Sequence, residues 1–215
     1  MMLMSRRCVL SLSIAALATP ALIRPSFAGS CTSYASLERG IVFKRKDGTR
    51  GLARRESDGS VVIDYVNNQG DRTDRRTVVK GVFETRRIYS DSEFPVVGSA
   101  PPEFTWKYSP KPVEPEAGGS WTGKVNELRD DVGYGAYMKE YHNRSRTTWK
   151  ATYSFLQMGE ANFSGCHYMT LPVEAVFTGE QGTRTQRWIY FPQLGFGIET
   201  KRDGVSNGLI DMQAA

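Results

Sequence analysis

The sequence predicts an all-β protein in which an antiparallel meander forms a strongly curved sheet or half-barrel. At most one or two short helices are expected besides a signal-peptide helix. The 215 residues include 21 glycines and 10 prolines, and 11% are aromatic, a composition typical of short strands and tight turns rather than of helical bundles. Apolar and polar residues alternate with a period of two over much of the chain. About nine or ten consecutive strands cannot stay flat, because strand twist accumulates, so the sheet must curl or split into two layers.

Residues 1–28 have the features of a secretory signal peptide. Arg6 and Arg7 give a positive start, residues 8–22 are mostly apolar, and the small residues Ser26 and Ala28 precede a predicted cleavage point before Gly29. Residues 5–10 also resemble the twin-arginine export motif of bacteria, with the general secretion route as the alternative. We therefore expect a periplasmic protein that is peripheral to the membrane at most, and residues 28–31, which resemble a lipoprotein box, leave lipidation of Cys31 open.

The charge of the chain is unevenly distributed. Removing residues 1–28 takes away three arginines and lowers the formal net charge from +5 to +2. Residues 38–87 hold thirteen Lys and Arg against eight Asp and Glu, whereas residues 88–215 hold twelve against fifteen. A basic first half favours anionic surfaces such as lipid headgroups or polysaccharide, and we expect no nucleic-acid partner for an exported protein.

Residues 39–89 are predicted to form basic β-hairpins. Asp47-Gly48 and Asp58-Gly59 lie between runs of β-formers, and such pairs tolerate the positive φ of tight hairpin turns. Residues 61–66 form an apolar run that ends at a further turn over residues 67–70. Residues 77–89 are expected to form one long strand with a solvated face.

Residues 95–115 contain six of the ten prolines and are predicted to be a connector. Proline lacks the amide hydrogen that a central strand donates, so most of the segment should cross over or run along an edge. Phe104, Trp106 and Tyr108 alternate within it. They form either a short strand that tucks aromatic rings into the core or one wall of a ligand site.

Residues 118–203 are predicted to be the C-terminal meander, followed by a tail over residues 204–215. Strands are expected over residues 120–125, 147–155, 162–171, 173–178, 183–191 and 196–201, with Pro172 and glycine turns between them. Residues 126–146 are left open. Tyr134, Tyr137 and Tyr141 have helical spacing, but Gly133 and Gly135 each weaken a helix by about 1 kcal/mol relative to alanine.

Cysteine and histidine offer one candidate for chemistry. The string Ser164-Gly165-Cys166-His167 resembles the nucleophile segment of the L,D-transpeptidases, which would imply a cysteine-dependent peptidoglycan enzyme. On a strand, however, Cys166 and His167 point to opposite faces, so His167 is poorly placed to take the thiol proton. In an oxidising compartment Cys31 and Cys166 are expected to form a disulfide instead. With two histidines in the chain and no metal-ligand spacing, no metal and no cofactor is expected.

The remaining charged motifs have structural explanations. Asp130 and Asp131 are neighbours that diverge on any regular element, and a solvated turn is expected there. Three arginine pairs occur at 54–55, 75–76 and 86–87. One arginine of each pair should face solvent, and the other must reach a carboxylate or extend to water.

A loose resemblance to a known class covers residues 118–203. It is carried by Gly119-Ser120-Trp121-Thr122-Gly123, by residues 153–159 and 163–166, and by the run Thr185 to Gly195, which ends in an aromatic-Pro-x-x-Gly corner. These segments resemble uncharacterised bacterial envelope proteins of the lipoprotein-localisation-factor-like class. The resemblance implies a curved antiparallel half-barrel with a concave apolar face and, in the best-known members, carriage of lipoprotein acyl chains. It implies no catalytic residue.

These observations lead to the hypothesis of an exported, non-catalytic envelope protein that binds a hydrophobic or lipid-like ligand, such as an acyl chain, on a concave sheet face. The candidate lining residues are Trp106, Trp121, Trp149, Tyr153, Phe155 and Trp188, any of which can equally be core. One alternative is an interaction scaffold that docks an anionic envelope component through its basic N-terminal half. The other is an enzyme that uses Cys166.

Overall fold

Among the residues that the structure describes, one antiparallel sheet of 14 strands dominates the fold, with more strands than the nine or ten that the sequence predicts. The structure is a computed structural model, and it describes residues 31–89, 100–134 and 139–215. The predicted signal peptide lies outside these residues. One four-residue helix, α1 (Ser36–Arg39), precedes the sheet. The fold class is therefore confirmed.

The strands follow one another along the sheet with few exceptions. Their bounds are β1 (Ile41–Arg45), β2 (Arg50–Arg55), β3 (Val61–Val66), β4 (Arg72–Val79), β5 (Phe83–Tyr89), β6 (Glu103–Ser109), β7 (Ser120–Tyr134), β8 (Glu140–Phe155), β9 (Gly159–Phe163), β10 (Cys166–Gly179), β11 (Gly182–Phe191), β12 (Phe196–Arg202), β13 (Val205–Ser206) and β14 (Leu209–Ala214). Their order is β13-β12-β11-β10-β8-β7-β6-β5-β4-β3-β2-β1-β14, and β9 pairs with β10 alone.

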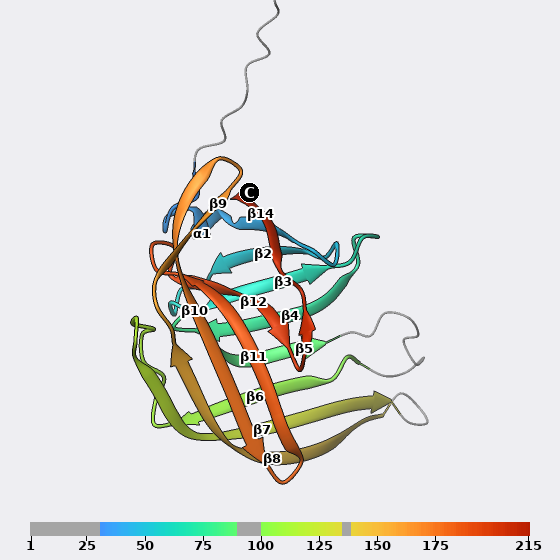
Figure 1. Cartoon of the computed structure of the whole chain (residues 1–215). Coiled ribbons are helices and arrows are strands. Elements are labelled where there is room, and N and C mark those ends of the chain that lie inside the picture. The colour runs from blue at the N-terminus through green and yellow to red at the C-terminus, as the bar shows by residue number, and fades with distance from the viewer. Residues whose placement is uncertain (1–30, 90–99, 135–138) are drawn as a thin grey trace, which may run out of the picture.

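The sheet curls so far that its two ends come together. β13 extends one edge beside β12, and β14 forms the other edge beside β1. Only two residues separate β13 from β14. In that link the Asn207 amide donates to the Thr200 carbonyl on β12, and the Lys46 amide beyond β1 donates to the Gly208 carbonyl, both at 2.8 Å. The link therefore spans the open seam of a half-barrel, with β10, β11 and β12 crossing over β3, β4 and β5 (Figure 1).

Backbone contact between the two layers depends on glycine. The Gly197 amide on β12 donates to the Gly81 carbonyl in the β4–β5 turn at 2.8 Å. Gly81 has a φ of 74°, and a Cβ there would lie 2.5 Å from the Tyr190 ring. Gly81 is thus required both by its backbone conformation and by the close approach of the opposite layer.

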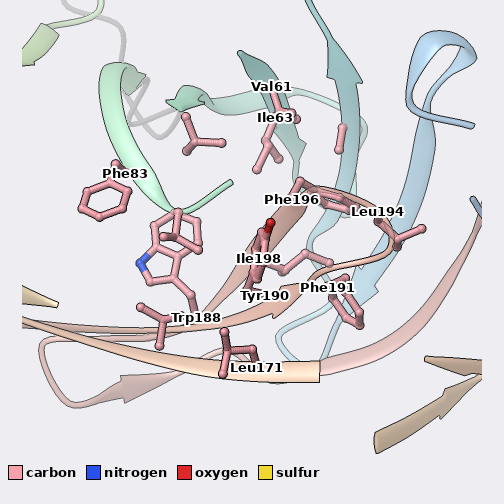
Figure 2. Close-up of a cluster of buried hydrophobic side chains, with 14 of the residues drawn as sticks. Val61, Ile63, Phe83, Leu171, Trp188, Tyr190, Phe191, Leu194, Phe196 and Ile198 are labelled. Atoms are coloured by element: carbon pink, nitrogen blue, oxygen red, sulfur yellow. The ribbon is translucent and has the colours of Figure 1, made fainter. Parts of the chain in front are cut away.

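The inside of the curl is filled by its own side chains. Figure 2 shows one part of this cluster, in which Val61 and Ile63 from β3 face Trp188, Phe196 and Ile198 from the opposite layer. The fully buried side chains include two tryptophans and three tyrosines. Burial of such rings is the main stabilising contribution to a fold of this kind.

The predicted strand over residues 77–89 is wrong, because a hairpin interrupts it. Residues 80–82 turn the chain between β4 and β5, with Lys80 and Gly81 at φ of 50° and 74°. Two consecutive positive φ angles are typical of a tight hairpin turn. Lys80-Gly81 lacks the Asn or Asp that marks such turns in a sequence.

The proline-rich segment contains an internal strand rather than an edge strand. β6 lies between β5 and β7, and all six prolines fall outside it. Phe104, Trp106 and Tyr108 share the inward face, since their partners on β7 are Arg129, Glu127 and Val125. The sheet therefore continues through the predicted connector.

The predicted break at Pro172 is also wrong, and the turn lies earlier in the chain. Residues 164–165 separate β9 from β10, and Pro172 lies within β10. β10 pairs with β9 up to Thr170 and with β8 from Val173 onward. Pro172 stands where the partner changes, and its carbonyl accepts from the Leu156 amide at 2.9 Å. A strand tolerates proline at a position where no carbonyl of a neighbouring strand would accept a hydrogen bond from the amide that proline lacks.

Two further segments contain strands that the sequence did not predict. Much of the open segment 126–146 belongs to β7 and β8, which pair from Ser120 with Ser154 to Tyr134 with Glu140. The predicted tail 204–215 contains β13 and β14. Asp130 therefore lies on a strand and not in a turn, although it diverges from Asp131 as expected.

Candidate functional site

Five of the six predicted lining residues are packed in the core. Trp121, Trp149, Tyr153, Phe155 and Trp188 are each at most 3% exposed. Phe83 links several of them, with its ring centroid 4.3 Å from that of Tyr153 and 5.5 Å from that of Trp121. These rings fill the hollow of the half-barrel, so an apolar ligand would have to displace them. Their role as ligand-lining residues stays a prediction.

Trp106, the sixth candidate, lies at the edge of the core and is half-buried. Its ring stacks with Phe104 at a centroid distance of 5.9 Å. Its indole nitrogen donates to Glu127 at 2.9 Å, and the same carboxylate oxygen accepts from Trp149 at 3.2 Å and from Arg184 at 2.8 Å. Trp106 is thus held by a polar group, which marks the border between the apolar core and a polar end of the barrel.

The predicted disulfide is present. Cys31 and Cys166 are joined across 135 residues of sequence. Tyr168, two residues further along β10, holds the same N-terminal segment through its hydroxyl, which lies 2.7 Å from the Thr32 hydroxyl. Because the Cys166 sulfur is bonded to Cys31, it cannot act as a thiolate nucleophile, and Cys31 cannot at the same time carry a lipid thioether.

Removing the bridge should weaken the fold without altering its class. We expect the double variant Cys31→Ser, Cys166→Ser to lose about 2–5 kcal/mol of unfolding free energy, since the bridge constrains a long loop of the unfolded chain. Urea unfolding of the protein, with and without reductant, measures this loss. A reductant that left the midpoint of the parent protein unchanged would contradict a stabilising role for the bridge.

The two histidines lie apart and on the surface. His167 is exposed and lies 3.0 Å from Glu160, whereas Cys166 is buried on the other face of β10. His142 on β8 lies 2.9 Å from Asp130, which also binds Arg144 at 2.9 Å. Neither histidine is near an activated nucleophile. Among residues 31–89, 100–134 and 139–215, no group of three or more Cys, His, Asp and Glu side chains is arranged to hold a metal.

A buried network of charged side chains lies on the inner face of the barrel, and we call it the charged band. Arg76 on β4 bonds Asp74 at 2.6 Å and lies 3.0 Å from Glu199 on β12. Arg202 on β12 joins Glu199 at 2.6 Å to Glu84 on β5 at 2.8 Å. All of these side chains except Arg202 are at most 8% exposed. The charged band therefore ties the two facing layers together.

Two β-bulges place the charged band. Between β4 and β5 the register shifts after Thr77, so that Glu84 and Arg87, three residues apart, both oppose inward residues of β4. Between β11 and β12 it shifts after Arg187, so that Glu199 opposes Trp188 and Arg202 opposes Gln186. A bulge re-aims a side chain that regular alternation would send to the other face.

Ionisation of the charged band reflects its burial and pairing. Burial alone would raise the pKa of Glu199, but the Arg76 and Arg202 charges outweigh it and lower the pKa to about 2. Burial likewise opposes the ionisation of Asp74, yet Arg76 and Arg87 lower its pKa below the usual value. Burial raises the pKa of Tyr65 despite the nearby guanidinium groups, so its phenol stays neutral and able to donate a hydrogen bond.

A recess opens above the charged band, at the end of the barrel where β1, β3, β4 and β5 face β12 and β13. This mouth cleft has a volume of about 460 Å³. Its walls include Arg45, Tyr65, Arg76, Arg87 and Tyr89. The guanidinium carbons of Arg45 and Arg76 lie 5.1 and 4.8 Å from the centroid of the Tyr65 ring. The mouth cleft thus combines planar charged groups with aromatic surface.

Two other recesses are less suited to a ligand. A small cavity of about 20 Å³ lies below the mouth cleft and includes Glu84, Gln186 and Arg202 in its wall, and it is large enough for about one water molecule. A recess of about 520 Å³ near α1 is bordered by exposed side chains that are already paired, such as Lys80 with Glu114 at 2.7 Å and Arg55 stacked 3.3 Å over Tyr34. The mouth cleft is therefore the candidate site.

Sequence reasoning found the basic half but missed the residues of the mouth cleft. The expectation for paired arginines holds at 75–76, because Arg75 reaches toward Asp64 on the outer face while Arg76 is buried against Asp74. It also holds at 86–87, where the half-exposed Arg86 pairs with Glu103 and Arg87 reaches Asp74. At 54–55, Arg55 instead donates to the Tyr34 carbonyl. Asp74 and Arg76 alternate with Val78, which is a visible signal of an inward-facing charge pair. Glu199 within the run Phe196–Thr200 is a second signal, since a lone carboxylate in an apolar strand needs a buried partner.

Comparisons with known proteins place the chain in no family. No family model, no curated protein and no solved structure matched it. Within the part of the chain that the structure covers, no helix is long and apolar enough to cross a membrane.

Proposed function

We propose that this protein is an exported, non-catalytic binding protein of the cell envelope that holds its ligand in the mouth cleft. The observation that carries the proposal is the contrast between the two halves of the concave face. The apolar half is filled by its own rings, whereas the polar half leaves a recess of about 460 Å³. Ligand sites in β-barrels commonly lie at such mouths.

The composition of the mouth cleft supports binding rather than catalysis. Asp74 and Glu199 are each held between two arginines and have lowered pKa values, so neither is poised to take up a proton near neutral pH. Cys166, the candidate nucleophile, lies in a disulfide. What remains is a rigid array of donors and aromatic faces, which can orient a ligand without changing it.

The mouth cleft changes which class of ligand is favoured. An acyl chain on the aromatic candidates requires the core to open, at a cost of several kcal/mol for each large ring exposed. A polar or amphipathic envelope component can enter the mouth cleft with the core intact. Such a component combines the two binding hypotheses from the sequence, since an amphipathic molecule carries a polar head and an apolar part.

Native mass spectrometry of the mature protein, purified from its own envelope, tests the proposal. We expect a bound mass that solvent extraction releases. Tyr89→Ala, at a cleft residue that is 37% exposed, should lower occupancy at least about fivefold, as truncation of a contact aromatic commonly does.

The matched control is Val176→Ala on β10, which is 43% exposed on the outer face of the sheet and is not among the residues that line the mouth cleft. This variant should keep the parent occupancy. A protein that carries no ligand in any form, or a ligand whose occupancy Tyr89→Ala leaves unchanged, would refute the mouth cleft as its site.

A further inference from the structure

We infer that the mouth cleft recognises an oxyanion, a phosphate or carboxylate group of its ligand, through the Tyr65 hydroxyl and the Arg45 guanidinium. This inference rests on the proposed function and adds the chemistry of the bound group. It follows from how the donors and acceptors around the mouth cleft are used.

The acceptors of the mouth cleft are already engaged. Asp74 receives hydrogen bonds from Arg76 and Arg87, and Glu199 receives one from Arg202. Asp47 accepts from Arg45 at 2.7 Å, and Asp203 accepts from the Thr185 amide at 2.8 Å. The carboxylates of this wall are therefore held by partners within the protein.

The donors are in surplus. Tyr65 Oη and Arg45 Nε are both buried polar atoms with no hydrogen-bond partner, and both residues line the mouth cleft. Tyr65 is 1% exposed and Arg45 is 6% exposed. A buried donor without a partner costs about 1–3 kcal/mol, so two such donors from residues in the wall of one recess indicate a missing acceptor.

The missing acceptor is an oxyanion rather than a neutral group. The Tyr65 ring lies near the guanidinium groups of both Arg45 and Arg76. Burial raises the pKa of Tyr65, so its hydroxyl remains a donor and adds no negative charge. An oxyanion can accept from a phenol and a guanidinium at once, and such charge-assisted bonds are about twice as strong as neutral ones.

Unpaired acceptors lie elsewhere, which makes the arrangement at the mouth cleft specific. Glu84 Oε1 and Gln186 Oε1 lack partners too, but both border the cavity of about 20 Å³ on the other side of Arg202. A single water could donate to both of these oxygens. In the mouth cleft, by contrast, the unpaired atoms of Arg45 and Tyr65 are donors and the space is far larger.

The test compares inorganic phosphate with chloride at matched ionic strength, using the mature disulfide-bonded protein. Isothermal titration calorimetry should detect saturable phosphate binding that chloride does not reproduce. Tyr65→Phe keeps the ring and removes only the unpaired hydroxyl, so the variant should fold at least as stably as the parent. Its phosphate affinity should fall at least about tenfold, as the loss of a hydrogen bond to a charged group implies.

Tyr190→Phe is the matched control, because Tyr190 borders the recess near α1 and not the mouth cleft. It should leave phosphate affinity unchanged. A second set of measurements uses phosphatidylcholine vesicles with and without phosphatidylglycerol, and binding to the anionic vesicles alone, lost in Tyr65→Phe, would identify a lipid headgroup as the source of the oxyanion.

The outcomes separate this inference from the proposed function. Phosphate and anionic vesicles that both bind Tyr65→Phe as well as the parent, or bind neither protein, would overturn the oxyanion site. If a native ligand is nevertheless found whose occupancy depends on Tyr89, the proposed binding function stands without it.

Discussion

Replacing Glu199 by alanine should lower the free energy of unfolding by about 3–5 kcal/mol, because the change leaves buried arginine charge without its partner. Glu199 is 1% exposed and pairs with Arg76 at 3.0 Å and with Arg202 at 2.6 Å. Arg202 keeps Glu84, but Arg76 keeps only Asp74, which Arg87 shares. Chemical denaturation of the parent protein and the variant measures the loss.

The control for this prediction is an ion pair that spans neighbouring strands in the open. Glu174 and Arg187 lie 3.6 Å apart on β10 and β11, and each side chain is 49% exposed. Exposed pairs contribute about 0–1 kcal/mol, so Glu174→Ala should unfold close to the parent protein. Equal losses in the two variants would show that Glu199 contributes no more than a surface charge.

Acid titration gives the same prediction a second readout. Glu199 has a folded-state pKa of about 2, below its ordinary value of 4.5. A lowered pKa stabilises the folded state above the unfolded-state value, and this contribution disappears as the pH falls toward the folded-state value. The parent protein should therefore lose stability between pH 4.5 and about 2, and the Glu199→Ala variant should lose less over that range.

Alternation and turn residues were enough to predict the class of fold. Asp47-Gly48 and Asp58-Gly59 form the expected turns, in which the Gly48 and Gly59 amides donate to Arg45 and Glu56. The aromatic-Pro-x-x-Gly corner is a turn as well, where the Leu194 and Gly195 amides donate to the Phe191 carbonyl. Turn chemistry is local, and a short segment of sequence therefore contains it.

The pairing of the last strand of the chain with the first could not be predicted in this way. β14 pairs with β1, which begins more than 160 residues earlier at Ile41. Nothing in the composition of residues 204–215 distinguishes a tail from the strand that completes a sheet. Likewise, the Lys80-Gly81 turn depends on the opposite layer, because the Gly81 carbonyl accepts a hydrogen bond from the Gly197 amide. Such contacts are set by tertiary structure rather than by local preference.

The residues of the candidate site could not be predicted from alternation, because two β-bulges interrupt the period of two. A strict period of two would place Glu199 and Arg202 on opposite faces, and the same holds for Glu84 and Arg87. Each bulge shifts the register by one residue, so all four side chains face inward. Sequence periodicity therefore assigns one side chain of each of these two pairs to solvent, and only the register of the folded sheet places both side chains above the core.

Replacing Trp188 by alanine should cost about 3–5 kcal/mol of unfolding free energy, comparable with the loss at Glu199 but for a different reason. Trp188 is fully buried and packs among the apolar side chains of the opposite layer (Figure 2). Alanine leaves a cavity, and the two layers cannot move closer to fill it because their backbones are already in contact where the Gly197 amide donates to the Gly81 carbonyl.

Trp188→Phe separates packing from polarity at the same position. The Trp188 indole nitrogen has no hydrogen-bond partner in the structure, and removing a buried donor of this kind offsets part of the volume that is lost. We therefore expect Trp188→Phe to cost only about 1–2 kcal/mol. Thermal unfolding of both variants, with and without the native ligand, then shows whether Trp188 is a core residue or part of the wall of a ligand site. A core residue gives a large loss in Trp188→Ala that is independent of ligand, whereas a ligand wall would give a stable Trp188→Ala variant that has lost the stabilisation by ligand.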